Sequence, residues 1–232
     1  AGSEAPDMAN LDLDKTLADL FEAERKVRKL HDQLSDASAT DDFATLEKAV
    51  KAAQAEADEE EASMRLERIA LLLGEQEGPK AVDMLIDVLA SDFPDARLVA
   101  AEQLEGLAFD RFKEVAQGIE RALKRLAVGS PALPELPYVL AEVPEPGVSK
   151  LLEQFLAHAD ADAVAAAIEV AVELGDAGLT DAIAALEGDM RTVEVADEQD
   201  EPTEVTIADL VDDALDILKG GDDELDESET KH

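Results

Sequence analysis

The stretch Asp92-Phe-Pro-Asp-Ala-Arg-Leu-Val-Ala-Ala-Glu-Gln-Leu-Glu-Gly-Leu107 decides the fold of this chain. Its last residue belongs to a series that recurs at steps of 34, 33 and 34 residues: Leu73, Leu107, Leu140 and Leu174. A second series, offset by about half a period, recurs at steps of 33, 33 and 34: Ile86, Ile119, Leu152 and Leu186. Two interleaved series of one period predict copies of a two-helix unit, each of which buries its apolar face against its neighbours.

Other residue types keep the same register. Three valines share the 33-residue step, each four residues before a member of the second series and therefore on the same helix face: Val82, Val115 and Val148. Pro79 and Pro146 stand 67 residues apart, each where a helix begins and a proline loses no hydrogen bond. Asp95 and Asp162 are also 67 apart. Each is placed to cap the following helix or to favour the positive end of its dipole.

The quoted stretch resembles the second helix of a HEAT repeat, of the short bacterial and archaeal kind also found in phycobilisome-lyase-like proteins. The pattern of that family is an Asp/Pro turn, an Arg, and then small or apolar residues three, four, seven and ten positions later. It is matched here by Arg97, Ala100, Ala101, Leu104 and Leu107. The resemblance covers roughly residues 62–218 and implies an all-α fold, an α-solenoid of about four helical pairs. It implies no single function, because HEAT repeats serve many roles.

Two further copies match this pattern in part. The copy from Asp162 to Leu174 keeps the small and apolar positions but has Val164 where the Arg would fall. The copy that ends at Leu140 contains three prolines, at positions 131, 134 and 137, so its helix is expected to be short or distorted. An irregular helical bundle is the alternative architecture.

The N-terminal part has a different pattern. Apolar residues follow alternating three- and four-residue steps, as in a coiled-coil seam: Leu13, Leu17, Leu20, Val27 and Leu34. After a polar turn a second helix is expected to start with Phe43, Leu46, Val50 and Ala53, and its charged stretch, residues 56–61, to project as a solvated arm. We predict a flexible N-terminus over residues 1–10, an antiparallel helical hairpin over 11–60 and the solenoid over 61–218.

An insertion interrupts the last repeat. Arg191–Val195 and Thr203–Ile207 are alternating, β-branched runs around an acidic loop, which predicts a β-hairpin at about residues 190–207. The hairpin either covers the end of the solenoid, the alternative we favour, or offers an edge strand to a partner. The last segment, residues 219–232, has almost nothing to bury and is expected to be a disordered acidic tail.

The chain has a net charge of −37, with 57 acidic against 20 basic residues spread over nearly every predicted helix. Such dispersal is typical of adaptation to a salt-rich cytoplasm. A surface that attracts a basic partner or mimics nucleic acid is the alternative, although a mimic is expected to concentrate its charge on one face. Direct binding of DNA or RNA is disfavoured, because phosphate contacts need basic patches.

Composition limits the chemistry. The absence of Cys excludes disulfides, thiol catalysis and cysteine metal sites. No apolar run approaches the length of about 20 residues that a membrane span needs, and the start of the chain does not resemble a signal peptide, so we expect a soluble, cytoplasmic protein. The three histidines do not stand at metal-ligand spacing, and His158–Asp162 does not continue into a calcium-binding loop. We predict no enzyme activity, no cofactor and no metal.

A protein partner is expected on the concave face lined by the second helices of the pairs. Acidic candidates for that contact are Glu102, Glu105, Glu169 and Glu173. The only strongly basic cluster is formed by Arg25, Lys26, Arg28 and Lys29. Because Glu22 and Glu24 each precede one of these by four residues, a self-paired helix face is favoured there over a ligand site.

Two other functions stay open. One is an enzyme subunit that resembles phycobilin lyases, in which HEAT helices cradle a chromophore, although aromatic residues make up only 3% of this chain. The other is an acidic chaperone or nucleic-acid mimic that binds basic proteins. The preferred interpretation is a non-enzymatic scaffold or adaptor.

The midpoint of thermal unfolding, followed by circular dichroism, is expected to rise between low and molar KCl. At about 1 M salt the Debye length is only ~3 Å, so the repulsion within a chain of net charge −37 is largely screened. A midpoint that does not change would contradict the interpretation of the charge as an adaptation to salt.

Overall fold

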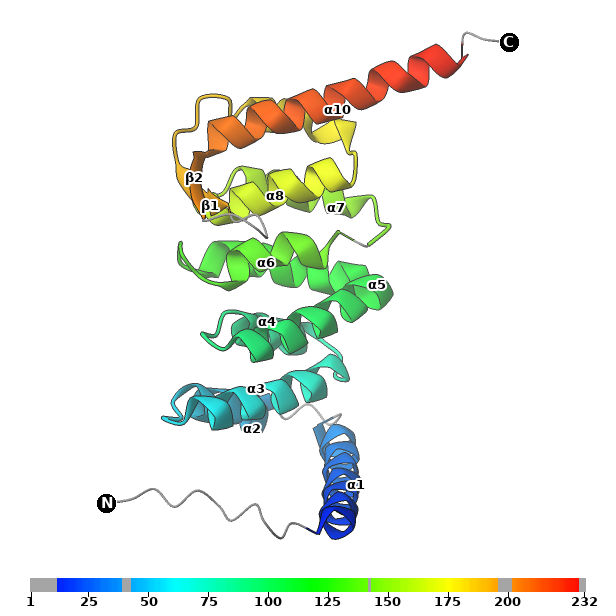
Figure 1. Ribbon diagram of the computed structural model, residues 1–232, viewed down its shortest axis with the longest axis vertical. Coiled ribbons are helices and arrows are strands. Elements are labelled where there is room, and N and C mark those ends of the chain that lie inside the picture. Colours follow the sequence, from blue (N-terminus) through cyan, green and yellow to red (C-terminus); the bar gives the residue numbers. More distant parts are fainter. Residues whose placement is uncertain (1–11, 39–42, 142, 196–201, 230–232) are drawn as a thin grey trace. The chain divides into compact units, whose positions relative to one another are not determined.

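The computed structural model describes residues 12–38, 43–141, 143–195 and 202–229, which are mostly helical (Figure 1). The predicted flexible segment at residues 1–10 lies outside them. The chain divides into two compact units, which we call the first unit, Ala1–Asp42, and the second unit, Phe43–His232. In the first unit the structure describes one helix, α1 (Leu13–Ser38). Asp12 precedes it, and the Asp12 carboxylate accepts a hydrogen bond from the N–H of Lys15 at 3.1 Å.

The second unit contains nine of the ten α-helices found among the described residues, and two strands. The helices are α2 (Phe43–Gln54), α3 (Glu59–Gly74), α4 (Pro79–Leu89), α5 (Pro94–Arg125), α6 (Ala132–Val139), α7 (Gly147–Leu156), α8 (Ala161–Glu173), α9 (Thr180–Ala184) and α10 (Ile207–Glu229). They pack in chain order (Figure 1). One layer runs from α3 through α5, α6 and α8 to α10, and the other helices pack beside it.

The two apolar series lie in the core. Five of their eight members have no exposed surface: Leu73, Ile86, Ile119, Leu140 and Leu152. The exceptions lie mostly at the end of the series, where Leu174 is 40% exposed and Leu186 is half-buried. Packing is less complete there because α9 is only 5 residues long.

Helix α5 contains the end of one predicted pair and the start of the next. Its backbone leaves helical geometry at Arg111 (φ −136°, ψ 48°), between Leu107 and Ile119. The guanidinium of Arg111 donates to the carbonyl of Gln76 at 2.9 Å, which ties the kink to the end of α3. The proline-rich copy forms α6, which has 8 residues and contains Pro137, so the prediction of a short helix is confirmed.

The residues that cap the helices differ in part from the predicted ones. The side chain that caps α8 belongs to Asp160, which is 2% exposed and accepts from the N–H groups of Ala163 at 2.9 Å and Gly129 at 2.6 Å. Asp162 and Asp95 lie within the first turns of α8 and α5 instead. Neither side chain is the cap of its helix, and the predicted interaction with the positive end of the dipole stays a prediction.

The second N-terminal helix is shorter than predicted. It ends at Gln54, and a new helix starts after Asp58, whose carboxylate accepts from the N–H of Glu61 at 3.1 Å. The prediction that residues 56–61 form the middle of this helix and project as an arm is therefore wrong, because this cap and an ion pair of 3.0 Å between Glu56 and Arg65 direct them into the start of α3. Residues 57–60 are exposed, as predicted for a solvated stretch. As predicted, α2 buries Leu46, Val50 and Ala53; they lie in the second unit, so the hairpin over 11–60 stays a prediction.

The predicted β-hairpin is confirmed. Strands β1 (Thr192–Val195) and β2 (Thr203–Thr206) pair antiparallel, with Val193 opposite Val205. Arg191 fixes its base, because the guanidinium donates to the carbonyls of His158 at 2.9 Å and Ala159 at 2.8 Å. Helix α10 follows directly and continues to Glu229, past position 219, where the sequence predicts a disordered tail to begin.

The close approach of α4 and α5 depends on Gly118. A Cβ atom at that position would lie 2.4 Å from the Cγ1 of Val82. Gly118→Ala is expected to lower the free energy of unfolding by about 1–3 kcal/mol, because the helices would have to separate. Denaturation with urea in molar KCl measures the change.

Gly106 gives the matched control. It lies in the same helix, and a Cβ there would meet nothing within 4 Å, so Gly106→Ala is expected to stabilise the protein by up to about 1 kcal/mol. Adding Val82→Ala to Gly118→Ala is expected to recover part of the loss. Equal effects of the two glycine substitutions would contradict this account of the helix contact.

Candidate functional site

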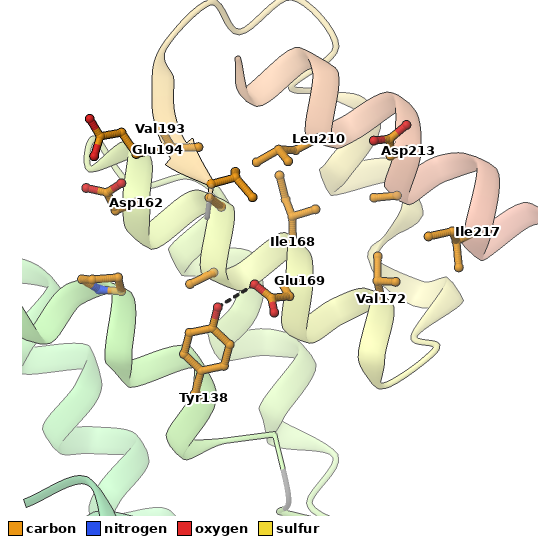
Figure 2. A pocket seen from close by; sticks show the side chains of 15 residues that line it. Tyr138, Asp162, Ile168, Glu169, Val172, Val193, Glu194, Leu210, Asp213 and Ile217 are labelled. Atoms are coloured by element: carbon orange, nitrogen blue, oxygen red, sulfur yellow. Dashed lines mark hydrogen bonds between the residues drawn. The ribbon is translucent and has the colours of Figure 1, made fainter. Parts of the chain in front are cut away.

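A groove of about 500 Å³ lies in the second unit between α6, α8, β1 and α10 (Figure 2). We call it the α8 groove. Its larger apolar lining residues come from three of these elements: Ile168, Val172, Val193, Val195, Leu210 and Ile217. Of these, Val193 and Ile168 are buried, and Ile217 is 58% exposed. The groove therefore offers apolar surface that a ligand can cover.

The groove forms where the helical pairs depart from regularity. Helix α6 is short, and its Pro134 lines one end. On α8 the lining residues Ala165 and Ala166 carry only a methyl group, which leaves volume that longer side chains would fill. The inserted hairpin supplies β1 as a further wall. The sequence feature that interrupts the repeat thus builds part of the site.

All charged lining residues are carboxylic acids: Asp162, Glu169, Glu194 and Asp213. They surround the apolar surface rather than meeting at one point (Figure 2). Burial raises the pKa of Asp162 above its ordinary value, and the nearby charges of Asp160 and Glu194 raise it further. Asp160 and Glu194 thus repel the charge of Asp162, so a cationic group that binds beside them would relieve the repulsion.

Tyr138 and Glu169 form the polar contact of the groove. The Tyr138 hydroxyl donates to Oε2 of Glu169 at 2.7 Å, from α6 to α8 (Figure 2). The pKa of Tyr138 is raised, first by burial and then by this hydrogen bond and the negative charges of Glu169, Glu135 and Glu173. A phenol with a raised pKa holds its proton, so it is suited to hydrogen bonding and not to acting as a nucleophile or base.

The predicted partner-binding residues lie on three different helices. Glu169 lines the α8 groove, and Glu173 lies one turn later on α8, where its charge acts on Tyr138. Glu102 and Glu105 are exposed on α5 and do not line the groove. The four basic candidates, Arg25, Lys26, Arg28 and Lys29, are exposed on α1 in the first unit.

Sequence reasoning missed Tyr138, Asp162 as a groove residue, and the part of α10 that faces α8. One signal for Tyr138 was present. It is the single tyrosine of the chain and precedes Glu169 by 31 residues, close to one repeat, which places the two on neighbouring helices of one layer. The contribution of α10 had no such signal, because the insertion separates it from the regular period.

Among the residues that the structure describes, no group of three or more His, Asp or Glu side chains is arranged to hold a metal ion. Within the same residues, no helix combines the length and apolar character needed to cross a membrane. Nδ1 of His158 accepts from the N–H of Asp160 at 3.1 Å, in the turn that precedes α8.

Comparison with known proteins gives no assignment: no family model matches the chain, and no curated protein or solved structure matches it. The resemblance to HEAT repeats stays a prediction that rests on the residues quoted above.

The phenolate absorbance of this protein reports on the α8 groove alone, because the chain has 1 Tyr and no Trp. In the folded protein Tyr138 is expected to ionise above the pH of about 10 that is typical of an unfolded chain. The stability that comes from the protonated phenol is therefore fully present below pH of about 10 and is lost as the pH rises further.

Two variants test whether Glu169 raises the pKa of Tyr138. Glu169→Gln is expected to lower the pKa of Tyr138, because it removes a charge and a charge-assisted hydrogen bond. Glu102→Gln, on α5 outside the groove, is expected to leave it unchanged. Circular dichroism at each pH verifies that the chain is still folded. A folded wild-type protein with an unshifted tyrosine would contradict the groove geometry.

Proposed function

We propose that this chain is a non-enzymatic protein-binding scaffold with a HEAT-like α-solenoid, which holds a basic, amphipathic segment of a partner protein in the α8 groove. The observation that carries the proposal is the combination of apolar lining residues with charged groups that are all carboxylates. Apolar grooves between helices take one face of a helix or an extended segment. Carboxylates beside such a groove favour Lys or Arg next to the apolar anchor.

High salt weakens the contribution of the carboxylates of the groove to binding more than that of its apolar lining. In the salt-rich cytoplasm that the composition predicts, charges more than about 3 Å apart are largely screened at molar ionic strength. The affinity must then come chiefly from burial of Ile217, Val172 and their neighbours. The carboxylates act at short range, where they select basic over acidic sequences and set the orientation of the bound segment.

The sequential packing of the second unit supports the solenoid part of this proposal. Each described helix of that unit contacts neighbours close in the sequence, and one layer runs from α3 to α10. Stacked helical pairs of this kind present a continuous series of second helices, which is the surface that repeat proteins use for binding.

A small ligand is the second candidate. The groove volume of about 500 Å³ lies in the range of small-molecule sites, roughly 300–1,000 Å³, as a phycobilin-lyase-like protein would need. The four carboxylates disfavour an anionic ligand, so a neutral or cationic compound fits better. The acidic chaperone stays open as a less selective form of the main proposal.

Affinity capture from the source lysate in molar KCl, followed by crosslinking and mass spectrometry, tests the scaffold. A partner is expected to crosslink to α8 and α10 through a segment that carries apolar and basic residues. Ile217→Glu is expected to weaken its binding tenfold or more, about 1.4 kcal/mol, because it places a charge on the apolar lining.

Leu98→Glu is the matched control, since Leu98 is 60% exposed against 58% for Ile217 and lies on α5 outside the groove. It is expected to leave binding unchanged. Equal capture by both variants would contradict the groove as the binding site. A protein that yields no partner but carries a compound in native mass spectrometry would support the second candidate.

A further inference from the structure

Helix α1 exposes a row of large apolar side chains. Its 26 residues include six that are 48–66% exposed: Leu13, Leu17, Leu20, Phe21, Leu30 and Leu34. An isolated helix is marginally stable in water, and a helix with an apolar stripe gains most of its stability from whatever covers the stripe. We propose that α1 pairs in antiparallel orientation with α1 of a second copy of this chain. This inference is independent of the α8 groove.

The spacing of the exposed residues fits a two-stranded coiled coil. Leu13, Leu17 and Leu20 start a seam of alternating four- and three-residue steps that continues through Glu24, Val27, His31 and Leu34. Phe21 and Leu30 lie beside the seam, at the positions that flank the core of such pairs. The seam holds apolar residues at five of its seven positions, which is enough to bury a continuous stripe.

The polar seam position Glu24 selects the orientation. In a parallel pair in register it would lie directly against Glu24 of the second copy, and two carboxylates would share the core. In an antiparallel pair centred on Glu22, it lies opposite Leu20 of the second copy. In the same pair Leu17 lies opposite Val27 and Leu13 opposite His31, so no layer holds two carboxylates and the two layers of Leu17 with Val27 are apolar on both sides.

The charges of α1 favour the same arrangement. Residues 12–38 carry five basic and seven acidic side chains, whereas the whole chain carries 20 and 57, so α1 lacks most of the repulsion that opposes association elsewhere. Its basic residues are concentrated at positions 25–29, and acidic residues precede them. The antiparallel pair brings Asp14 of each copy beside Arg28 of the other, twice by symmetry. A parallel pair would align the two basic clusters instead.

Analytical ultracentrifugation of the full chain in molar KCl tests the association. The wild-type protein is expected to be a dimer, and Leu20→Glu to raise its dissociation constant tenfold or more by placing a charge in the seam. Ala18→Glu is the matched control, because it makes the same charge change on the outer face of α1, and the dimer is expected to persist. A monomeric wild type, or a dimer that Leu20→Glu leaves intact, would overturn the proposal.

Disulfide formation tests the orientation, because the chain has no Cys of its own. In the antiparallel pair Thr16 lies beside Leu30 of the second copy. A mixture of Thr16→Cys and Leu30→Cys is therefore expected to form a mixed disulfide dimer upon mild oxidation, while neither variant does so alone. A mixture that forms no more mixed dimer than each variant forms by itself would refute the antiparallel assignment.

Discussion

The helices of the second unit bury their apolar side chains chiefly against helices close in the sequence. This constraint fits the period of the sequence, because Ile86, Ile119 and Leu152 recur at steps of 33 residues and are all fully buried. It also requires close helix contacts, since aromatic residues are only 3% of the chain and Ala, Val and Leu fill most of the core. Gly118, which lets α5 approach Val82 on α4, is one consequence.

The same constraint explains where the packing of the second unit becomes irregular. A terminal pair has a neighbour on one side only, so its outer face needs another cover or remains accessible. Near the C-terminal end α9 is short, the β-hairpin interrupts the repeat, and α10 follows directly after this insertion. The α8 groove lies among these departures, where packing leaves apolar surface uncovered. The proposed binding site therefore lies where the repeat pattern of the sequence is least regular.

Three arginines join elements of the second unit within this acidic surface. Arg121 pairs with Asp83 at 2.9 Å and Arg125 with Asp87 at 2.6 Å, which joins α5 to α4 twice at the same spacing of 38 residues. Arg191 holds the base of the β-hairpin. The cluster of basic residues at positions 25–29 sets α1 apart from the rest of the chain.

The sequence by itself determined the helical content, the period, the short proline-containing helix and the β-hairpin, because each depends on local spacing or on the backbone limits of proline and β-branched residues. It also marked Glu169 as a partner-binding candidate. Only the tertiary structure decided that Asp160 is the cap of α8, that α2 ends before Glu56, and that Tyr138, Val193 and Ile217 share one groove with Glu169. These outcomes depend on competition between alternative contacts and on volumes left by neighbouring helices, which no spacing along the chain records.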